Sequence, residues 1–459
     1  MKVAVIGAGY VGSVTGAAFA ASGHHVTVID SDKRKVDRIN SGRSPIYEPG
    51  LDALIDAMVR RRLLSASDRY DSIRDADVAF IAVGTPSRPD GTADLAYVRS
   101  AADAIGDAIN RDRFTVIVDK STVPVGTAAL VASRIEERSG LKHGEMFAVA
   151  SNPEFLREGY ALEDVFYPDR IVIGTGNAKA RRMLRKLYAP LLGRRTYGAL
   201  ADVVPQPSRP LAEPVYFETD EKSAEMIKYV SNAFLAVKIS YINEVAKLCE
   251  ALGTDVNDVA AGVGLDSRIG AKFLQVSSGW SGSCFPKDTA ELLSASRKYG
   301  NELTIVQAAV DSNRSMHDYC VEKVRRRLKT LIGKRIGVLG LTFKPNTDDA
   351  RQTQASAIIS GLLDLGASVS AHDPQGMAMF QTLNPDLEVR YCSSGEETAE
   401  GADGVLLLTH WDEYARLDWV AMRRRMRTPY VLDTRNFLRK APWKKRGIEY
   451  EGIGIGAVR

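Results

Sequence analysis

Cys284 has neighbours that suit covalent catalysis. It lies in the run Gly279-Trp280-Ser281-Gly282-Ser283-Cys284-Phe285-Pro286-Lys287-Asp288, where small residues leave room for a substrate. Lys287 can stabilise a thiolate, and Asp288 can hold or activate a water molecule. A thiolate traps an aldehyde as a thiohemiacetal, and loss of a second hydride leaves a thioester that water hydrolyses to an acid. We therefore expect Cys284 to be a nucleophile. The other cysteines are expected to be inert core residues: Cys249, Cys320 and Cys392.

A glycine-rich turn near the start of the chain has the spacing of a dinucleotide site. It reads Gly7-Ala8-Gly9-Tyr10-Val11-Gly12 and lies between a predicted strand and a predicted helix. The first glycine permits a tight turn, the second lets the backbone approach a pyrophosphate, and the third allows close packing of helix on strand. Asp30 ends the next predicted strand, where it would accept the ribose hydroxyls and repel a 2′-phosphate. The pattern predicts an NAD site rather than an NADP site.

Predicted strands and helices alternate through the first 200 residues. Strands are expected at 3–6, 25–30, 78–83, 114–120, 147–151 and 170–173, with amphipathic helices at 10–22, 51–62 and 95–109. This alternation implies a parallel sheet with helices on both faces, because parallel strands need a crossover. The proline-rich segment 201–214 has little periodicity and is typical of a linker or surface insertion.

The pattern then changes to long helices before it returns to alternation. Helices are predicted at 220–252 and 303–331, on either side of the Cys284 run, and Gly253 is placed to end the first of them. The apolar residues of that helix recur at helical spacing: Ile227, Val230, Phe234, Tyr241, Val245 and Leu248. Further strands are expected at 335–343, 368–373, 404–410 and 430–435. We predict an α/β fold of two doubly wound Rossmann-like domains joined by a central long-helix domain.

The composition argues against nucleic-acid and membrane partners. The 459 residues include 61 Lys and Arg against 57 Asp and Glu, and a formal net charge of +4 gives no strong field for polyanions. No apolar run approaches the roughly 18 residues that a membrane-spanning helix needs. The chain opens directly into a predicted strand, so no signal peptide is expected. Four widely separated cysteines without a C-x-x-C pair predict a reducing cytoplasm and no metal site.

Several motifs occur in order along nearly the whole chain. They are VIGAGYVG at 5–12, KSTVPVGT at 120–127, NPEFLREG at 152–159, NAFLA at 232–236, the Cys284 run, and FKPNTDD at 343–349. Together they closely resemble the UDP-glucose 6-dehydrogenases within the wider UDP-glucose/GDP-mannose dehydrogenase family. The resemblance implies a two-step, four-electron oxidation of UDP-glucose to UDP-glucuronate, with NAD as cofactor and with thiohemiacetal and thioester intermediates on Cys284. The alternatives are the same chemistry on GDP-mannose or a UDP-N-acetylhexosamine, and a catalytically silent NAD-binding scaffold.

The resemblance also implies how the chain is divided and assembled. It implies an NAD-binding Rossmann domain at 1–200, a linker or insertion at 201–215, a central helical dimerisation domain carrying Cys284 at 216–330, and a UDP-sugar-binding Rossmann-like domain at 331–459. A homodimer is expected, with Arg268 reaching the neighbouring active site.

By similarity to the family, the catalytic residues are Cys284, Lys228, Asn232, Asp288, Glu154 and Thr122. Lys228 and Asn232 are four apart on a predicted helix, so their side chains share one face. The lysine would stabilise developing oxyanions and the asparagine would add a hydrogen bond. Glu154 would order water and substrate, while Thr122 would position the water that Asp288 holds. Which group takes the first proton stays open at this point.

The same resemblance assigns two sets of binding residues. The cofactor set is Gly7, Gly9, Tyr10, Val11, Gly12, Asp30, Lys35, Thr85, Thr122, Glu158, Lys287 and Arg351. The substrate set is Glu154, Phe155, Leu156, Arg157, Glu158, Lys228, Asn232, Arg268, Phe273, Leu274, Gln275, Val276, Ser277, Ser281, Lys344 and Arg435. The chain departs from the family pattern at three places: Ser281 stands where a glycine is usual, Gln352 stands where a glutamate is usual, and segment 201–214 is longer than the family loop.

Overall fold

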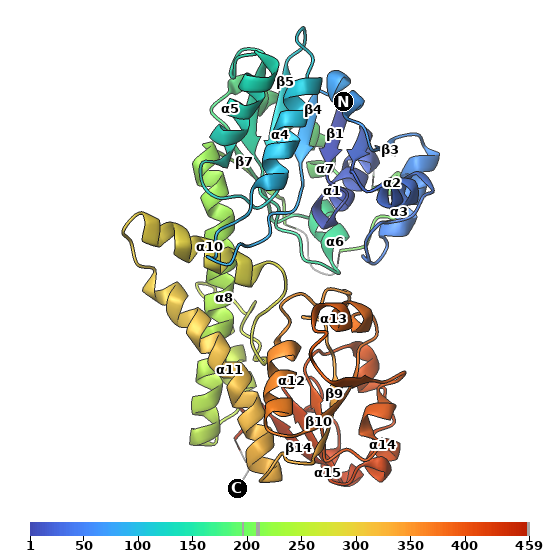
Figure 1. The fold of residues 1–459 in the computed structure, drawn as a ribbon, viewed down its shortest axis with the longest axis vertical. Helices are drawn as coiled ribbons and strands as arrows, with labels where there is room; N and C mark the ends of the chain where they lie inside the picture. The colour runs from blue at the N-terminus through green and yellow to red at the C-terminus, as the bar shows by residue number, and fades with distance from the viewer. Residues whose placement is uncertain (195–196, 208–211, 457–459) are drawn as a thin grey trace. The chain divides into compact units, whose positions relative to one another are not determined.

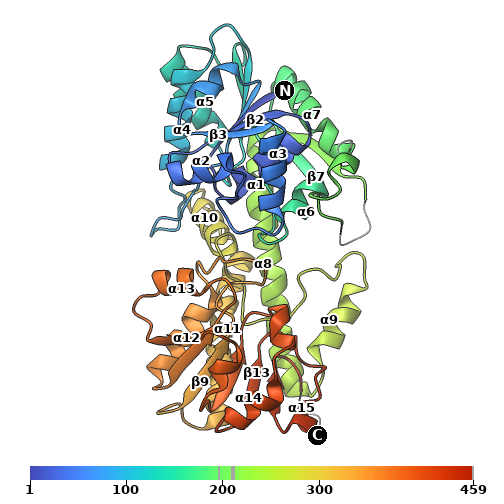
Figure 2. The ribbon, with the colours of Figure 1, turned by 90° about the vertical axis from the view of Figure 1, so that its right-hand side faces the viewer.

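The computed structural model of the chain describes residues 1–194, 197–207 and 212–456, and it contains two compact units. The first unit is Met1–Val230 and the second is Ser231–Arg459. Each unit is built around its own sheet (Figures 1 and 2). Part of the predicted insertion, residues 208–211, lies outside the described residues.

The first unit is an eight-stranded sheet, counted over the described residues, in the order β3-β2-β1-β4-β5-β6-β7-β8. The strands are β1 Lys2–Ile6, β2 His25–Ile29, β3 Leu64–Ser67, β4 Val78–Ile81, β5 Thr115–Asp119, β6 Phe147–Ser151, β7 Arg170–Gly174 and β8 Val215–Thr219. The helices are α1 Tyr10–Ala21, α2 Lys33–Asn40, α3 Leu51–Arg60, α4 Ala96–Ala108, α5 Thr127–Ser139, α6 Ala161–Phe166 and α7 Ala178–Leu192, with 3-10 turns η1 Tyr70–Asp75 and η2 Gly198–Leu200.

Two hydrophobic cores cover the two faces of this sheet. Helices α1, α3 and α7 pack on one face through side chains such as Phe19, Leu54 and Leu184. Helices α4 and α5 pack on the other face through Val98 and Val131. Central strands covered on both faces are mostly apolar, and every residue of β4, β5 and β6 is buried, the polar Thr115, Asp119 and Ser151 included.

The predicted parallel sheet is confirmed for all but one of its strand pairs within the described residues. The exception is β7, which pairs with β6 in antiparallel orientation, at Ser151 and Gly174. The connection between these strands contains only the short helix α6, and without a full helical crossover the chain does not return in parallel. The edge strand β8 was not expected, because edge strands lack the continuous apolar run of a buried strand.

The second unit is a six-stranded parallel sheet within the described part of the chain, in the order β11-β10-β9-β12-β13-β14. The strands are β9 Arg335–Leu339, β10 Ser368–His372, β11 Val389–Tyr391, β12 Gly404–Leu407, β13 Tyr430–Asp433 and β14 Glu449–Gly452. The helices are α9 Val256–Gly264, α10 Phe285–Lys298, α11 Thr304–Leu328, α12 Gln354–Asp364, α13 Met377–Leu383, α14 Trp419–Arg425 and α15 Trp443–Arg446, with 3-10 turns η3 Glu396–Ala399 and η4 Asp412–Ala415. Helix α8, Glu221–Leu252, begins in the first unit and ends in the second.

The strand orders confirm the predicted fold class. In each sheet the first strand, β1 or β9, lies in the interior, and later strands are added on both sides of it. This strand order is the doubly wound Rossmann arrangement. The predicted strand 335–343 ends early, at Leu339, because Gly340 turns the chain with a φ of +97°. Of the helices in the described ranges, none is both long and apolar enough to cross a membrane.

Candidate active site

The glycine turn of the first unit forms the cradle that a dinucleotide needs. Gly7 has a φ of +105°, and a Cβ there would lie 2.6 Å from the carbonyl oxygen of Ala82. A Cβ on Gly12 would lie 1.8 Å from the carbonyl oxygen of Gly7, so only glycine lets α1 start this close to β1. A Cβ on Gly9, the N-cap of α1, would meet nothing within 4 Å. The open backbone at a helix N-terminus fits the pyrophosphate of NAD.

Asp30 orders the same turn from the end of β2. Its Oδ2 accepts a 2.7 Å hydrogen bond from the amide of Ala8, and its Oδ1 accepts one from the amide of Asp32. The Nζ of Lys35 lies 3.6 Å from Oδ2. The acid is therefore next to the glycine turn, where a ribose would need a hydrogen-bond acceptor.

Other predicted residues of the first unit meet around the carboxyl ends of its strands. The Thr85 hydroxyl donates a 2.8 Å hydrogen bond to the carbonyl of Thr122, which joins two predicted cofactor residues from separate loops. The hydroxyl of Tyr10 accepts a 2.6 Å hydrogen bond from the amide of Gly159, directly after Glu158. These contacts bring the loops after β4, β5 and β6 to one edge of the sheet, where Rossmann folds bind ligands.

Glu154 and Lys228 form a buried ion pair. The Nζ of Lys228 lies 2.7 Å from Oε1 of Glu154, and the two side chains are 5% and 8% exposed. Oε2 of Glu154 accepts a 2.6 Å bond from the amide of Leu156, which fixes the carboxylate. Burial alone would raise the pKa of Glu154, but the Lys228 charge and these hydrogen bonds hold it below its usual value. Glu154 is therefore an anion that can order a polar ligand.

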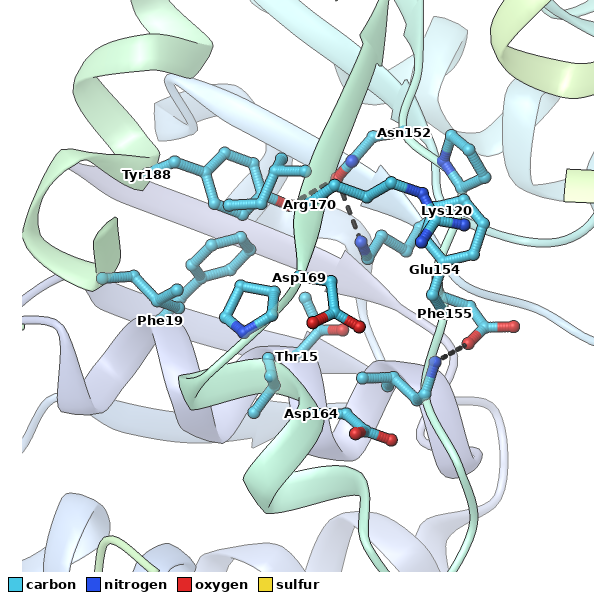
Figure 3. A pocket seen from close by; sticks show the side chains of 16 residues that line it. Thr15, Phe19, Lys120, Asn152, Glu154, Phe155, Asp164, Asp169, Arg170 and Tyr188 are labelled. Carbon is cyan, nitrogen blue, oxygen red and sulfur yellow. Dashed lines mark hydrogen bonds between the residues drawn. The ribbon is translucent and has the colours of Figure 1, made fainter. Parts of the chain in front are cut away.

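A cavity opens beside Glu154, between α1, α6, α7 and the start of β7. Figure 3 shows Phe19 and Tyr188 on one side of it, with Lys120, Glu154 and Phe155 opposite. Above the Phe155 ring, the guanidinium of Arg170 lies 4.0 Å from the ring centroid, an attractive cation–π distance.

The candidate nucleophile of the second unit lies at a helix N-terminus. Cys284 is the N-cap of α10 and is half-buried, whereas the other cysteines are buried. The positive end of a helix dipole favours a thiolate there. Burial raises the pKa of Cys320 to about 12 and that of Cys392 to about 11, which makes these two thiols poor nucleophiles.

Asp288 links the residues around Cys284. Its amide donates a 2.8 Å hydrogen bond to the carbonyl of Cys284. Its Oδ1 accepts from Lys287 at 2.6 Å and its Oδ2 accepts from Nδ2 of Asn232 at 2.6 Å. Asp288 is only 1% exposed, so its carboxylate is held in one orientation. The structure thereby brings together four residues that the sequence predicted: Asn232, Cys284, Lys287 and Asp288.

The Cys284 loop is anchored on both sides within the second unit. The amide of Trp280 donates to Oδ1 of Asn313 at 2.7 Å, and its indole donates to the hydroxyl of Ser240 at 2.9 Å. The hydroxyl of Ser281, the residue that departs from the family glycine, donates to Oε1 of Gln354. Ser281 is thus engaged with α12, and sequence reasoning did not identify Gln354 as its partner.

The predicted substrate segment 273–277 is largely buried. Leu274, Val276 and Ser277 are at most 4% exposed, and the amide of Ser277 donates to Oδ1 of Asn243 at 2.9 Å. Phe273 has a φ of +65°, a conformation that side chains rarely adopt without support from their surroundings. Gln275 is exposed, and its Nε2 donates a 3.4 Å hydrogen bond to the carbonyl of Ala271 in the same loop.

Several predicted arginines are held by neighbours in sequence. Forked hydrogen bonds join Arg157 to Asp164, Arg268 to Asp266 and Arg351 to Asp349. Arg268 is the most exposed of these three arginines, because 86% of its side chain is accessible to solvent. The Nζ of Lys344 lies 5.3 Å from the ring centroid of Phe343.

Arg435 differs from these arginines because it is tied to backbone. Its Nε donates to the carbonyl of Leu408 at 2.9 Å, and its Nη2 donates to that of Phe343 at 3.4 Å. Burial lowers its pKa to about 10, against the attraction of Asp433. The guanidinium is thus held next to the loop that contains Lys344.

Two buried groups near the first-unit site were not predicted. Lys120 is 8% exposed and donates to Oδ1 of Asn152 at 3.1 Å. Asp119 is 1% exposed, and neither of its oxygens has a hydrogen-bond partner among the described residues. Burial, with the charge of Glu225, raises the pKa of Asp119 to about 8. Lys120 is the first residue of the KSTVPVGT motif and Asp119 precedes it, but a role was predicted only for Thr122, and nothing in a strand pattern marks a buried charge.

Three family models match consecutive parts of the chain. They describe the UDP-glucose/GDP-mannose dehydrogenase family: its NAD binding domain at residues 1–192, its central domain at 222–315 and its UDP binding domain at 337–440. A UDP-glucose 6-dehydrogenase of Rhizobium meliloti (strain 1021) is 43% identical over 460 residues, which are 99% of each chain.

Solved structures are similar over the same length. A UDP-glucose dehydrogenase from Pyrobaculum islandicum is 39% identical with a TM-score of 0.85, covering 99% of this chain and 98% of that one. A UDP-D-ManNAc dehydrogenase from Pyrococcus horikoshii is 27% identical with a TM-score of 0.84 over the full length of both chains. The fold alone therefore does not distinguish a UDP-glucose dehydrogenase from a UDP-D-ManNAc dehydrogenase.

Proposed function

The chain belongs to the UDP-glucose/GDP-mannose dehydrogenase family, with the family's NAD-binding domain at residues 1–192, and we propose that it oxidises UDP-glucose to UDP-glucuronate in two NAD-dependent steps. The substrate rests on the 43% identity to a UDP-glucose 6-dehydrogenase over nearly the whole length. The glycine cradle and Asp30 would hold NAD, which accepts a hydride in each step when it is bound.

The observation that carries the proposed chemistry is the bonding around Asp288. In the first step the 6-hydroxyl loses a hydride and a proton and becomes an aldehyde, which the Cys284 thiolate attacks to give a thiohemiacetal. Loss of the second hydride leaves a thioester, and water then releases the acid and the thiol. Asp288, held by Asn232 and Lys287, is suited to orient that water. Lys228, Asn232 and Thr122 would stabilise the oxyanions and the water, and Glu154 would order the substrate.

The test is an assay of the purified chain with several sugar nucleotides. We expect UDP-glucose to yield two NADH per molecule and to have the highest kcat/KM. GDP-mannose or a UDP-N-acetylhexosamine as the best substrate would contradict the choice of sugar and leave the chemistry intact. A catalytically silent scaffold would bind NAD and release no NADH with any of them.

We also propose the assembly and compartment that the sequence predicted. The second-unit part of α8 exposes Phe234, Tyr241, Leu248 and Leu252 by 58–68%, which suits burial against a second copy. In such a homodimer, exposed Arg268 would reach the neighbouring site, and mixing Cys284→Ala and Arg268→Ala proteins would restore activity. Cys284 must remain a free thiol, so we propose the cytoplasm as the compartment.

The four-part division into 1–200, 201–215, 216–330 and 331–459 is proposed on the same basis. The family-model ranges 1–192, 222–315 and 337–440 support it. We assign NAD to the first part, Cys284 and the dimer contact to the third, and the UDP-sugar to the fourth.

A further inference from the structure

A buried lysine outside the predicted site is fixed by a network of neutral groups. Lys120 directly follows β5, and its Nζ donates to Oδ1 of Asn152 at 3.1 Å. Figure 3 shows Lys120 and Tyr188 reaching this same amide oxygen from different elements. The amide nitrogen of Asn152 donates to the carbonyl of Val172 at 2.8 Å. The orientation of the Asn152 amide is therefore determined, and the position of the ammonium group with it.

Lys120 and Lys228 are two buried cations that interact with the same buried acid, Glu154. Counted over whole residues, Lys120, Lys228 and Glu154 are 8%, 4% and 7% exposed, so all three lie in a region of low dielectric constant. Glu154 already accepts a 2.7 Å bond from Lys228, and it also attracts Lys120. Both ammonium groups thus stabilise the ionised form of Glu154. The two like charges in this region also disfavour each other's protonation.

The remaining charged groups around Lys120 are less buried or have partners of their own. Asp164 is bonded by exposed Arg157, and Arg170 lies over the Phe155 ring. Burial lowers the pKa of Lys120 to about 8, with Glu154 opposing that change and Lys228 adding to it. The titratable and charged groups that face Lys120 from the surrounding elements are Glu154 after β6, Asp164 of α6, Asp169 and Arg170 at β7, Tyr188 of α7 and Lys228 of α8.

We propose that Lys120 is a positioning residue for the reaction: its ammonium group keeps Glu154 ionised and keeps Lys228 directed toward the oxyanion that forms on the substrate. Lys120 acts through these two side chains and is not itself a catalytic residue. The inference rests on the proposed function, because it requires Lys228 to act at the reacting carbon. It adds a charge requirement that the family motifs do not state.

Removing the charge tests this role. In Lys120→Met, the like charge beside Lys228 and the second cation beside Glu154 are both lost, so both groups hold protons more tightly. We expect kcat with UDP-glucose to fall at least tenfold and its pH profile to move to higher pH by about one unit. Lys120→Gln keeps a donor for Asn152 without the charge, and we expect the same shift. This second variant also provides the measurement if Lys120→Met does not fold.

Tyr188→Phe is the matched control, because it removes the other donor to Oδ1 of Asn152 and leaves the charge unchanged. We expect its pH profile to coincide with that of the wild type. Unshifted profiles in both Lys120 variants, or an equal shift in Tyr188→Phe, would overturn the inference. Wild-type protein that produces no NADH from any sugar nucleotide would overturn the proposed function and this inference together. An active wild type with unshifted Lys120 variants would overturn this inference alone.

Discussion

Nδ2 of Asn232 donates a 2.6 Å hydrogen bond to Oδ2 of Asp288, and both side chains are buried. The contact joins α8 to the first turn of α10 within the second unit. Lys287 occupies the other carboxylate oxygen at 2.6 Å. With both oxygens bonded to separate donors, the carboxylate keeps one orientation one helical turn after Cys284. A fixed carboxylate one helical turn along the chain from a thiol is suited to hold a hydrolytic water.

Asp288→Asn removes the negative charge and keeps the size of the side chain. A general base contributes about 10²–10⁴-fold in rate, so we expect kcat to fall by at least about 10²-fold. Because thioester hydrolysis would then be slow, a covalent adduct on the chain should accumulate with UDP-glucose and NAD, detectable by intact-mass spectrometry. Glu322→Gln on α11 is the control, because it also removes the acid of an ion pair, the one with Arg325, outside the site. Wild-type turnover in Asp288→Asn would exclude the proposed role of the carboxylate.

The second and third glycines of the fingerprint, Gly9 and Gly12, should respond differently to alanine. An added Cβ at Gly9 meets nothing within 4 Å, so Gly9→Ala should leave the melting temperature unchanged and weaken NAD binding at least tenfold. At Gly12 the Cβ would lie 1.8 Å from the carbonyl oxygen of Gly7. Gly12→Ala should therefore also destabilise the first unit, by about 1–3 kcal/mol. Calorimetric titration and thermal denaturation measure the two effects.

Gly176→Ala is the matched control for these variants. An added Cβ there also meets nothing within 4 Å, and the residue is not part of the fingerprint. We expect neither stability nor NAD affinity to change. Equal NAD affinities in Gly9→Ala and Gly176→Ala would contradict the assignment of the turn to the cofactor.

The sequence predicted those parts of the site that depend on short-range order. The glycine turn and Asp30 follow from one strand–turn–helix unit and the next strand, and the structure has both as expected. Cys284, Lys287 and Asp288 lie within two turns of one helix end, so their proximity is a property of the local chain. The doubly wound fold class was likewise accessible, because alternating strands and helices restrict the topology.

What the sequence did not predict depends on contacts between distant segments. Lys120 bonds Asn152 across 32 positions, and Ser281 bonds Gln354 across 73. Hydrophobic periodicity does not identify such pairs, because it reports on local secondary structure and not on which polar side chains meet in the folded chain. The antiparallel pairing of β7 with β6 was missed for a related reason. An alternating pattern predicts that strands and helices exist, but it does not determine whether a strand runs parallel or antiparallel to its neighbour.

Asp119 should make the stability of the protein fall as the pH rises from about 4 to about 8. Its folded-state pKa is raised from 3.8 to about 8 by burial and by Glu225. A raised pKa gives a stabilising contribution that is present below about pH 4 and is lost as the pH rises through 8. Asp119→Asn has a similar shape and does not titrate. We expect its melting temperature to exceed that of the wild type by an amount that grows from pH 5 to pH 9, reaching about 5 °C.

Asp112→Asn is the control for this measurement, because Asp112 is exposed in the loop before β5. Its melting temperature should follow that of the wild type at every pH. A constant difference between Asp119→Asn and the wild type across the range would mean that Asp119 does not retain its proton in the folded state.

The exposed apolar face of α8 should control the oligomeric state. Phe234, Tyr241 and Leu248 recur every seven residues, so they lie on one side of the helix, and Phe234 is 62% exposed. In a homodimer formed through this face, Phe234→Glu places a charge in the contact from each copy. We expect the dimer Kd to rise by about 100-fold or more, seen as a monomer by light scattering after size-exclusion chromatography. Tyr97→Glu is a matched control, because Tyr97 is an aromatic residue 61% exposed and belongs to α4 of the first unit. An unchanged mass for Phe234→Glu, or dissociation in Tyr97→Glu as well, would show that α8 does not form the contact.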